Sequence, residues 1–537
     1  MKDDSDDPRA PGAGQGDPGA MPGDGDPGGA GADRARRRRQ RATTRRRRAS
    51  RSAQHRGRPG TGRSSVRSRR GAALVSLVGV LVVAGIVDTT VGRPARAVTG
   101  VAGAPAAPLV AAPPGVESSA WYCAGATGGA NGRADGSIAL TNTTPAAVRG
   151  QAVTASSSGK TAAQAVVVPA DGRIVLSPPP SVGGPFVATA VRLSGGGVVA
   201  QQSVAGPLGS ATTPCAPVTN GSWSFVGGST MIGDSLELAL FNPGATPASV
   251  NMTFATPGNL TAPPDLQGVS IPARGLVIED VGTYVQQSPL VATEVTAESG
   301  RFVADELELR TAGGTGMALM LGNPSPTDRC WFPVSIVAAD VQVDFNVFNA
   351  TSRPATVQMA ANLAQGTASP FALVVPAQSV YSLDASAQSR LPKMTLFSMT
   401  VTSRNGVPVV VGRSVRTTAP SPATSFDDAP ATCVSATRWA VADPPPLPTQ
   451  FTLGIQDAGS VAAHVQVRAL RDGHSVAVPS MAGIARPGVP LTIAVPAALA
   501  TNAVPLVVTA SVPVVVEQDG ADPGTGGLTS SAAIPLG

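Results

Sequence analysis

The chain has 537 residues, too many for one hydrophobic core, so several domains are expected. Its formal net charge of +6 is unevenly distributed: residues 1–33 carry −6, residues 34–70 carry +17 from Arg alone, and −5 remains for all that follows. The composition therefore excludes a uniformly basic protein, because the positive charge belongs to one N-terminal segment and the body of the chain is mildly acidic.

The N-terminal segment is predicted to be disordered and cytoplasmic. Residues 1–70 are first acidic and then Arg-rich, and they hold almost no large apolar side chains with which to offset the entropy of folding. We expect the Arg cluster to set membrane topology and to lie on anionic lipid. A nucleic-acid partner is not expected, because no fold or interleaved aromatic side chain directs the cluster towards one.

A membrane segment is predicted next. Residues 71–87 read GAALVSLVGVLVVAGIV without a charge, which is about 26 Å as a helix, and residues 71–92 are predicted to form a transmembrane signal-anchor. The preceding Arg cluster predicts a cytoplasmic N-terminus and an extracytoplasmic remainder of a single-pass cell-membrane protein. Residues 93–118 then form a Pro/Ala-rich spacer.

Two alternatives to an uncleaved anchor remain open. Ala95-Arg96-Ala97 resembles a small-x-small cleavage site, which would give a secreted protein cut near Ala97. Ser68-Arg69-Arg70 is a weak match to a twin-Arg export signal. The body of the chain is exported in each case.

An internal repeat organises the exported body. The four tryptophans of the chain, Trp121, Trp223, Trp331 and Trp439, follow one another at spacings of 102, 108 and 108 residues. They predict four repeats, over residues 119–218, 219–328, 329–434 and 435–520, with a flexible C-terminal tail over 521–537. Since the tryptophans recur at one position, we expect them to anchor cores.

The same local pattern follows each tryptophan. A run of alternating apolar residues ends in a turn-forming Asn or Asp, and these are Asn142, Asn242, Asn349 and Asp457. Later strands begin beside Pro, and Asn405-Gly406 is typical of a hairpin turn. Many short strands per repeat predict an all-β ectodomain of tandem immunoglobulin-like antiparallel β-sandwich repeats.

The positions of the four cysteines within the repeats predict two disulfides. Cys123 and Cys330 lie within two residues of an opening tryptophan, whereas Cys215 and Cys433 lie at the end of a repeat. We therefore expect Cys123–Cys215 in the first repeat and Cys330–Cys433 in the third. An exported compartment permits such bonds.

These motifs resemble known sequences. The opening Trp121-Tyr122-Cys123-Ala124, the L-x-L-x-N run and the V-P-A step resemble bacterial surface repeats, and the stretch from Phe241 to Val250 is the closest match to their core. The layout over about residues 65–520 resembles a family of uncharacterised actinobacterial membrane-anchored proteins. This resemblance implies a fold and a location, and it carries over no catalytic residue.

Candidates for catalysis are few. His464 and His474 are expected to be exposed or hydrogen-bonded. Glu306 and Glu308 share one strand face, which would suit glycoside hydrolysis, but the favoured interpretation is a solvated outer face. The acidic residues 519–522 lack calcium-loop spacing and are expected to form a plain loop. Without a nucleotide, zinc or triad motif, we expect no enzyme activity, cofactor or metal.

The sequence therefore predicts a non-enzymatic, membrane-anchored cell-envelope protein whose repeats scaffold or recruit an envelope protein or glycan. The alternative is a glycan-binding accessory module for cell-wall or polysaccharide assembly, and an unrecognised hydrolase is third. Aromatic residues make up only 4% of the chain, and Tyr284 and Tyr381 are the tyrosines outside the opening motif. This scarcity argues against a lectin that binds sugars by stacking.

Overall fold

The computed structural model describes residues 109–127, 134–311, 315–366, 368–417, 425–443, 450–521 and 528–537. All of them belong to one compact unit, residues 90–537. The predicted tail, the predicted transmembrane segment and the spacer as far as residue 108 lie outside the described residues. Within the described part of the chain, no helix combines the length and the apolar character needed to cross a bilayer.

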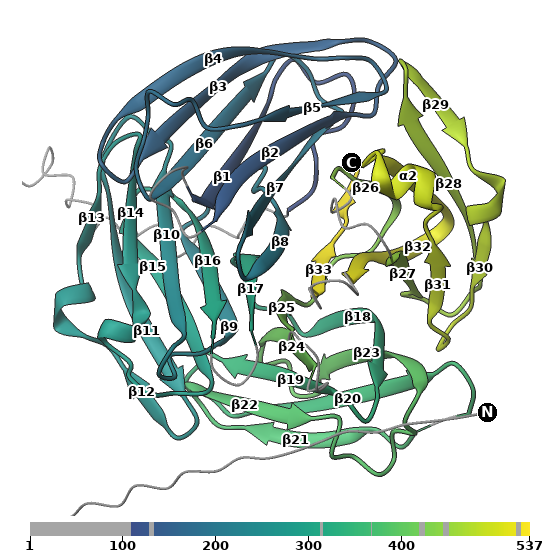
Figure 1. The fold of residues 1–537 in the computed structure, drawn as a ribbon. Helices are drawn as coiled ribbons and strands as arrows, with labels where there is room; N and C mark the ends of the chain where they lie inside the picture. Colours follow the sequence, from purple (N-terminus) through teal and green to yellow (C-terminus); the bar gives the residue numbers. More distant parts are fainter. Residues whose placement is uncertain are drawn as a thin grey trace, which may run out of the picture. The chain divides into compact units, whose positions relative to one another are not determined.

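Repeat 1 is a sandwich of two antiparallel sheets (Figure 1). The first sheet has the order β1-β6-β3-β4 and the second β5-β2-β7-β8. The strands are β1 (Ser119–Thr127), β2 (Asp135–Asn142), β3 (Val148–Ser156), β4 (Thr161–Val168), β5 (Gly172–Leu176), β6 (Phe186–Leu193), β7 (Val198–Gly206) and β8 (Gly209–Pro214).

Repeat 2 has the same two layers, with its outer edge divided in two. One sheet has the order β12-β11-β15-β9, with β13 also on β11, and the other β14-β10-β16-β17. The elements are β9 (Ser222–Gly228), β10 (Ser235–Asn242), β11 (Ala248–Thr256), β12 (Asn259–Thr261), the 3₁₀ helix η2 (Pro264–Leu266), β13 (Val269–Ile271), β14 (Gly275–Asp280), the 3₁₀ helix η3 (Val281–Thr283), β15 (Val291–Ser299), β16 (Val303–Arg310) and β17 (Gly316–Leu321).

Repeat 3 has the orders β18-β23-β20-β21 and β22-β19-β24-β25. The strands are β18 (Arg329–Val337), β19 (Val341–Asn349), β20 (Ala355–Leu363), β21 (Phe371–Val375), β22 (Ser379–Asp384), β23 (Thr395–Ser403), β24 (Val410–Thr417) and β25 (Phe426–Pro430).

Repeat 4 differs because one strand runs through both layers. The first half of β32 pairs with β26 and β28, and its second half pairs with β27 and β33. The elements are β26 (Ala436–Val441), β27 (Gln450–Asp457), β28 (Ala463–Arg471), β29 (His474–Ala477), the 3₁₀ helix η4 (Pro479–Met481), β30 (Gly483–Ala485), β31 (Leu491–Ala494), α2 (Ala497–Thr501), β32 (Leu506–Ala521), β33 (Leu528–Ala532) and β34 (Ile534–Pro535).

The structure confirms an all-β body of sandwich repeats and refines two expectations. In an immunoglobulin sheet the first strand neighbours the second, whereas here β1 neighbours β6, so the likeness is one of layers and size. The predicted flexible tail at 521–537 instead contains β33 and β34, which extend repeat 4. These strands are ordered because Ile534 and Ala533 are buried in the core.

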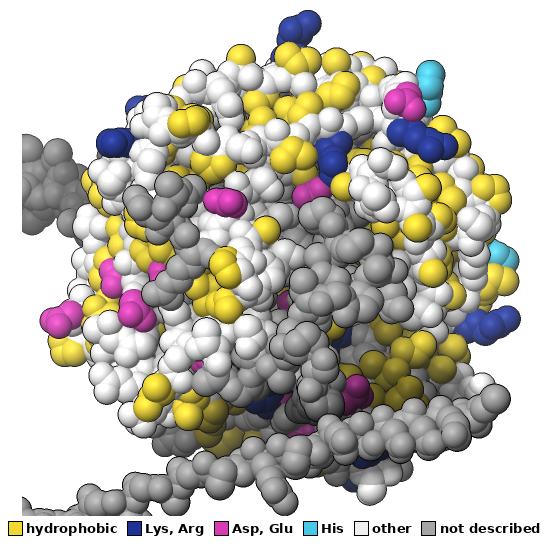
Figure 2. All heavy atoms as spheres, viewed as in Figure 1, with side chains coloured by type: hydrophobic (Ala, Val, Ile, Leu, Met, Phe, Trp, Pro, Cys, Tyr) yellow, Lys and Arg dark blue, Asp and Glu magenta, His cyan; other side chains and the backbone are white. Residues whose placement is uncertain are grey.

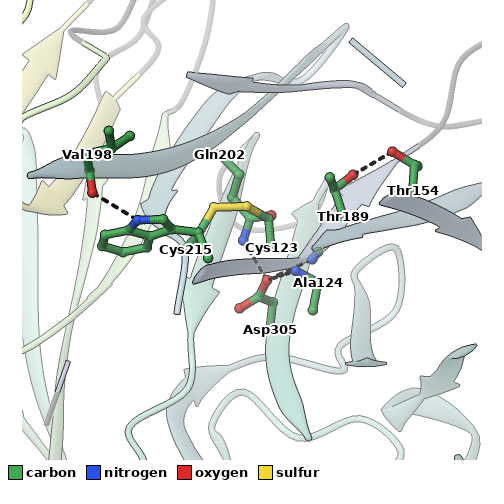
Figure 3. The surroundings of a disulfide bond; sticks show 10 residues. Cys123, Ala124, Thr154, Thr189, Val198, Gln202, Cys215 and Asp305 are labelled. Carbon is green, nitrogen blue, oxygen red and sulfur yellow. Dashed lines mark hydrogen bonds between the residues drawn. A yellow bond between two sulfur atoms is a disulfide. The ribbon is translucent and has the colours of Figure 1, made fainter. Parts of the chain in front are cut away.

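The repeated tryptophans join the two sheets of a sandwich. Trp121, Trp223 and Trp439 are fully buried, and each indole Nε1 donates to a backbone carbonyl about 75 to 79 residues later, at 2.9, 2.9 and 3.1 Å. Figure 3 shows this bond from Trp121 to Val198 beside the first disulfide. Trp331 differs, because the Arg329 guanidinium lies over its ring at 5.1 Å.

The repeated Asn side chains close the turn that follows each run. Asn349 Nδ2 donates to the Arg353 carbonyl at 2.7 Å and to the Pro376 carbonyl at 2.9 Å, while its Oδ1 accepts from the Thr351 N–H at 3.0 Å. Asn142 makes the equivalent bonds, and Asn242 differs only in that its distant acceptor is the Ile271 carbonyl, one residue earlier. One amide therefore ties a turn to a distant strand end by using both of its polar atoms.

Two disulfides join the first strand of a repeat to the residues after its last strand. They are Cys123–Cys215 and Cys330–Cys433, and no cysteine of the described residues is free. Each closes a loop of about 100 residues, which in the chain-entropy model stabilises the folded repeat by about 4–5 kcal/mol. Repeats 2 and 4 fold without such a bond.

Candidate functional site: a central pocket and the seams around it

The last strand of each second sheet, here called a closing strand, contacts the closing strands of two other repeats. β8 contacts β17 and β33, and β25 contacts the same two strands. These contacts form a closed cycle, and the four closing strands lie together at the middle of the unit in Figure 1. Repeat 4 therefore packs against repeat 1, and the repeats form a closed array.

A cavity of about 300 Å³, here called the central pocket, lies at the C-terminal ends of the closing strands. Every repeat contributes to its wall: residues 212–215 and 217 from repeat 1, residues 319, 321–325 and 327 from repeat 2, residues 430–434 from repeat 3, and residues 530–535 from repeat 4. Leu109, Trp121 and Trp439 complete the lining.

The lining of the central pocket is uncharged. No Lys, Arg, His, Asp or Glu occurs among its lining residues, all of which the structure describes. Its polar side chains are those of Ser, Thr, Asn323 and two tryptophans, and its two cysteines are in disulfides. The pocket can thus hold an uncharged and largely apolar group by packing, with hydroxyls to orient it.

The chain enters the described unit beside this pocket. Ala111 N–H donates to the Pro535 carbonyl at 3.0 Å, and Gly537 N–H donates to the Ala111 carbonyl at 3.3 Å. Leu109, two residues earlier, lines the pocket itself. The end of the predicted spacer is therefore fixed against the last strand of repeat 4.

The boundaries between consecutive repeats, here called seams, repeat one arrangement. The residues three and four positions after each tryptophan reach the next repeat. At seams 1/2, 2/3 and 4/1 they meet the strand residue that pairs with the second position of the L-x-L-x-N run, and at seam 3/4 Arg413 links them to it. The receiving residues are Asp305 at seam 1/2, Gly412 at seam 2/3, Glu517 at seam 3/4 and Gln201 at seam 4/1.

Seam 1/2 is built on one carboxylate. Asp305 Oδ2 accepts from the N–H groups of Ala124 and Gly125, at 2.8 and 2.7 Å, and from Gln202 Nε2 at 2.5 Å (Figure 3). Burial raises the pKa of Asp305 to about 7, although these hydrogen bonds lower it. A Cβ on Gly125 would lie 2.9 Å from the Asp305 Cβ, so only glycine permits this approach.

Seam 2/3 uses a close backbone approach and a buried cation. A Cβ on Gly412 would lie 2.5 Å from the Val226 carbonyl oxygen, so the two strands touch through their backbones. Arg310 of repeat 2 lies over the Phe426 ring of repeat 3, 3.8 Å from its centroid. Its Nε lies 2.5 Å from Glu308 Oε1, which neutralises part of the buried charge.

Seam 3/4 is held by Arg413, which is fully enclosed. Its guanidinium donates to the Val334 carbonyl, to Ser335 Oγ at 3.1 Å and to Glu517 of repeat 4. Asp519 Oδ1 lies 3.6 Å from the same guanidinium. Burial lowers the pKa of Arg413, but the Glu517 and Asp519 carboxylates outweigh it and raise this pKa overall.

Seam 4/1 closes the array with amide and carboxylate contacts. Gln201 Oε1 accepts from the Asp443 N–H and its Nε2 donates to the Asp443 carbonyl, both at 3.3 Å. The Asp443 side chain pairs with Arg173, and it accepts from Ser203 Oγ at 3.2 Å. Thr141 Oγ1 donates to the Ala442 carbonyl at 2.9 Å.

The structure corrects the expected exposure of Glu306 and Glu308. They do share one strand face, but both are buried. Glu306 pairs with Leu238 and Glu308 with Leu236, which lie in the core of repeat 2, so this face points into the sandwich. Burial, followed by the nearby Glu308 charge, raises the pKa of Glu306 well above its ordinary value. Burial also raises the pKa of Glu308, against the effect of Arg310.

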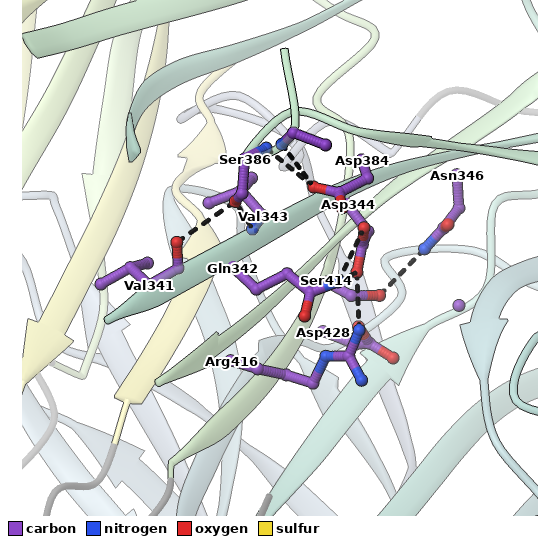
Figure 4. A network of polar contacts seen from close by, with 12 residues as sticks. Val341, Gln342, Val343, Asp344, Asn346, Asp384, Ser386, Ser414, Arg416 and Asp428 are labelled. Atoms are coloured by element: carbon purple, nitrogen blue, oxygen red, sulfur yellow. Dashed lines mark hydrogen bonds and ion pairs between the residues drawn. The ribbon is translucent and has the colours of Figure 1, made fainter. Parts of the chain in front are cut away.

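A polar network in repeat 3 reaches seam 2/3 (Figure 4). Asn346 Nδ2 donates to Ser414 Oγ at 2.9 Å, and Arg416 bonds Asp344 Oδ2 at 2.9 Å. Asp428 lies on the neighbouring closing strand beside Ser414. Burial, followed by the Glu308 charge from repeat 2, raises the pKa of Asp428 well above its ordinary value.

The other residues predicted from sequence lie away from the pocket lining. His464 and His474 are exposed, and the histidine side chains in Figure 2 stand at the outer edge of the view. Tyr284 stacks on Phe254 at 6.4 Å, whereas Tyr381 is 41% exposed. Asp519 was expected in a loop but lies on β32, because the strand continues to Ala521.

Sequence reasoning missed the seam residues. Each one lies far along the chain from its partner: Asp305 is 181 residues from Ala124. One signal was present, because a pair of polar residues interrupts the apolar strand at the same register in repeats 1, 2 and 4 and one residue later in repeat 3. These interruptions are Gln201-Gln202, Asp305-Glu306, Arg413-Ser414 and Glu517-Gln518.

The fold and the site define a closed array of four β-sandwiches around an uncharged pocket. The model described as "Family of unknown function (DUF5719)" matches residues 186–486, which is more than half of the chain. The chain therefore belongs to this family. The matched residues run from repeat 1 into repeat 4.

Comparison with other proteins adds little. No curated protein matches the chain. One similar solved structure is titled "Crystal structure of tetra-tandem repeat in extending region of large adhesion protein", at 12% identity, with 76% of this chain and 97% of that chain covered. Its TM-score is 0.09, and a value this low supports no structural argument.

Proposed function

We propose that the protein is a non-enzymatic component of an actinobacterial cell envelope. Residues 71–92 anchor it in the membrane, the Arg-rich tail is cytoplasmic, and the four sandwiches recruit an envelope partner outside the cell. The two disulfides support this placement, because such bonds persist in oxidising compartments.

The central pocket carries the proposal of recruitment. Its wall draws on all four repeats and holds about 300 Å³, near the lower end of ligand pockets. Its uncharged lining suits a neutral, largely apolar group presented by the partner. The proximity of Leu109 would then bring the bound partner to the spacer, and so towards the membrane.

The distribution of ionisable groups supports binding over catalysis. Most of the buried carboxylates occur in the seams, where Asp305 accepts backbone hydrogen bonds and Glu517 pairs with Arg413. These contacts serve assembly of the array. The pocket lining, in contrast, offers no pair of acid and base to move a proton.

A second candidate is recognition of an uncharged glycan in the same pocket. Thr213, Thr432 and Ser531 place hydroxyls in the wall, and two indoles also line it. Hydroxyls can bond sugar hydroxyls, and indoles can pack on sugar rings. Co-sedimentation of the protein with isolated cell-wall glycan separates this candidate from a protein partner.

Photo-crosslinking from the pocket tests recruitment directly. Ala431 lines the pocket and is half-buried, so p-benzoylphenylalanine placed there would contact a bound partner. We expect one discrete crosslinked envelope protein in intact cells, and none from position 372, an exposed alanine on β21. Ala532→Trp in the crosslinking chain should fill the pocket and abolish the product. Equal crosslinking from both positions would refute the proposal.

A further inference from the structure

The outer edge of repeat 1 differs from the corresponding edges of the other repeats. β4 forms this edge as one unbroken strand of eight residues, Thr161-Ala-Ala-Gln-Ala-Val-Val-Val168, without a charge or a proline. In repeat 2 the same edge is split into β12 and β13 around Pro263-Pro264, and in repeat 4 into β29 and β30 around Pro479. Such interruptions are common protection against unwanted strand pairing.

Repeat 3 protects its edge in a third way. β21 has only five residues and follows Pro370. The Arg390 guanidinium bonds the Ser369 and Pro370 carbonyls at 3.2 and 3.0 Å and lies over the Phe371 ring at 4.5 Å. Aligned on Val168-Pro169 and Val375-Pro376, Pro370 occupies the position of Ala163. Repeat 1 thus lacks the features that protect the corresponding edge strands of the other repeats from pairing with another strand.

The hydrogen bonds between β3 and β4 show which backbone groups of β4 point away from the sheet. The Ser156 N–H donates to the Lys160 carbonyl and closes the β3–β4 hairpin. Starting from Lys160, every second residue of β4 directs its backbone N–H and C=O groups to β3. Thr161, Ala163, Ala165 and Val167 therefore direct theirs away from the sheet. The side chains of these four residues are also exposed, with Val167 at 46%.

We propose that β4 pairs antiparallel with β4 of a second copy of this chain, forming a two-fold dimer. A two-fold axis beside Gln164 places Ala163 opposite Ala165 and Thr161 opposite Val167, so small side chains meet and no like charges oppose each other. The two Gln164 amides face one another, and an amide is its own complement as donor and acceptor.

This self-complementarity favours a second copy over a foreign strand. The pairing is isologous, so each chain uses its only β4 and the assembly closes at two copies. A dimer would also hold two central pockets together, which goes beyond the recruitment proposed above.

Cysteine crosslinking of the full-length protein in detergent tests the register. Opposed residues at the axis bring their Cα atoms to about 4.5–5.5 Å, which suits a disulfide. We expect Gln164→Cys to give a disulfide-linked dimer on mild oxidation, and Ala372→Cys on β21 to remain monomeric. A crosslink from Gln164→Cys to a different protein would identify a foreign strand and overturn the proposal.

Sedimentation velocity supplies a second readout. The unmodified protein should show a concentration-dependent dimer, which Ala163→Pro abolishes by removing an outward N–H while sparing the bonds to β3. Ala165→Lys should also abolish the dimer, because it places two positive charges at the pairing edge. Both variants should retain the thermal midpoint of the unmodified protein. Ala372→Pro on β21 is the matched control and should leave the dimer intact. A monomer at every concentration, or a dimer that survives Ala163→Pro, would refute the pairing.

Discussion

The Gly125 N–H of repeat 1 donates to Asp305 Oδ2 of repeat 2 at 2.7 Å, across a separation of 180 residues. The contact depends on two properties that only the assembled array requires: a carboxylate on an apolar strand, and a missing side chain opposite it. Seam residues of this kind determine how the sandwiches join.

Gly125→Ala should destabilise the protein by about 1–3 kcal/mol, because the added Cβ would overlap Leu319 Cδ1 and Asp305 Cβ at 2.7 and 2.9 Å. Chemical denaturation measures the change. Gly459→Ala is the control, since its Cβ would lie at an ordinary 3.5 Å from its nearest neighbour. Equal stabilities for the two variants would contradict the close fit at seam 1/2.

Stability should fall as the pH rises between about 4 and about 7. Burial raises the pKa values of Asp305 and Asp427 to about 7 in the folded protein, above the ordinary value of an unfolded Asp. The folded state then binds more protons, and each pH unit in this window costs about 1.4 kcal/mol per group.

Thermal midpoints measured at about pH 5 and about pH 8 test whether stability falls as the pH rises. Asp305→Asn and Asp427→Asn should each flatten the profile, because the amide cannot lose a proton. Asp340→Asn, at an exposed turn, is the control variant. A midpoint that rises with pH in the unmodified protein would contradict burial of these carboxyl groups as neutral acids.

Arg413→Met should cost about 3–5 kcal/mol, because it leaves the buried Glu517 without its cation. Adding Glu517→Gln should recover a large part of that loss, since the uncompensated charge disappears. Urea denaturation of both single variants and the double variant gives the coupling energy. Additive losses would show that the two residues do not interact.

Replacing both cysteines of either disulfide by alanine should cost about 2–4 kcal/mol, less than the chain-entropy model gives, because the effects of disulfides usually fall short of that model. The pairs are Cys123 with Cys215 and Cys330 with Cys433. Using double variants avoids a free thiol, and thermal denaturation under oxidising and reducing conditions is the measurement. The reducing agent should lower the midpoint of the unmodified protein but have no further effect on a variant in which all four cysteines are replaced.

Asn349→Asp should cost about 1–3 kcal/mol, because a carboxylate cannot donate to the Arg353 and Pro376 carbonyls. The reverse change in repeat 4, Asp457→Asn, should be neutral or stabilising. Asp457 Oδ1 accepts from the Gly459 N–H, but its buried Oδ2 has no partner. Thermal denaturation compares the two, and a larger loss for Asp457→Asn would contradict the assigned roles.

Periodic features could be predicted because their causes are local. The core position of Trp121 and the turn at Asn142 follow from alternation and side-chain chemistry within a short stretch. Glu308 could not be placed correctly from the same alternation. A polar strand face looks solvated because alternation alone does not show which face points into the sandwich, and contacts such as that of Arg310 with Phe426 join distant segments.

The closed cycle of closing strands also fixes the number of sandwich repeats in the array. An open solenoid can gain or lose a unit at either end, because a terminal unit is bound on one side only. Here both sides of every sandwich are occupied, and Gln201 already receives Asp443. A fifth unit would find no unoccupied seam, and removing one would break two seams at once. Duplication or loss of single repeats should therefore be rare in this family, and variation in length should occur in loops.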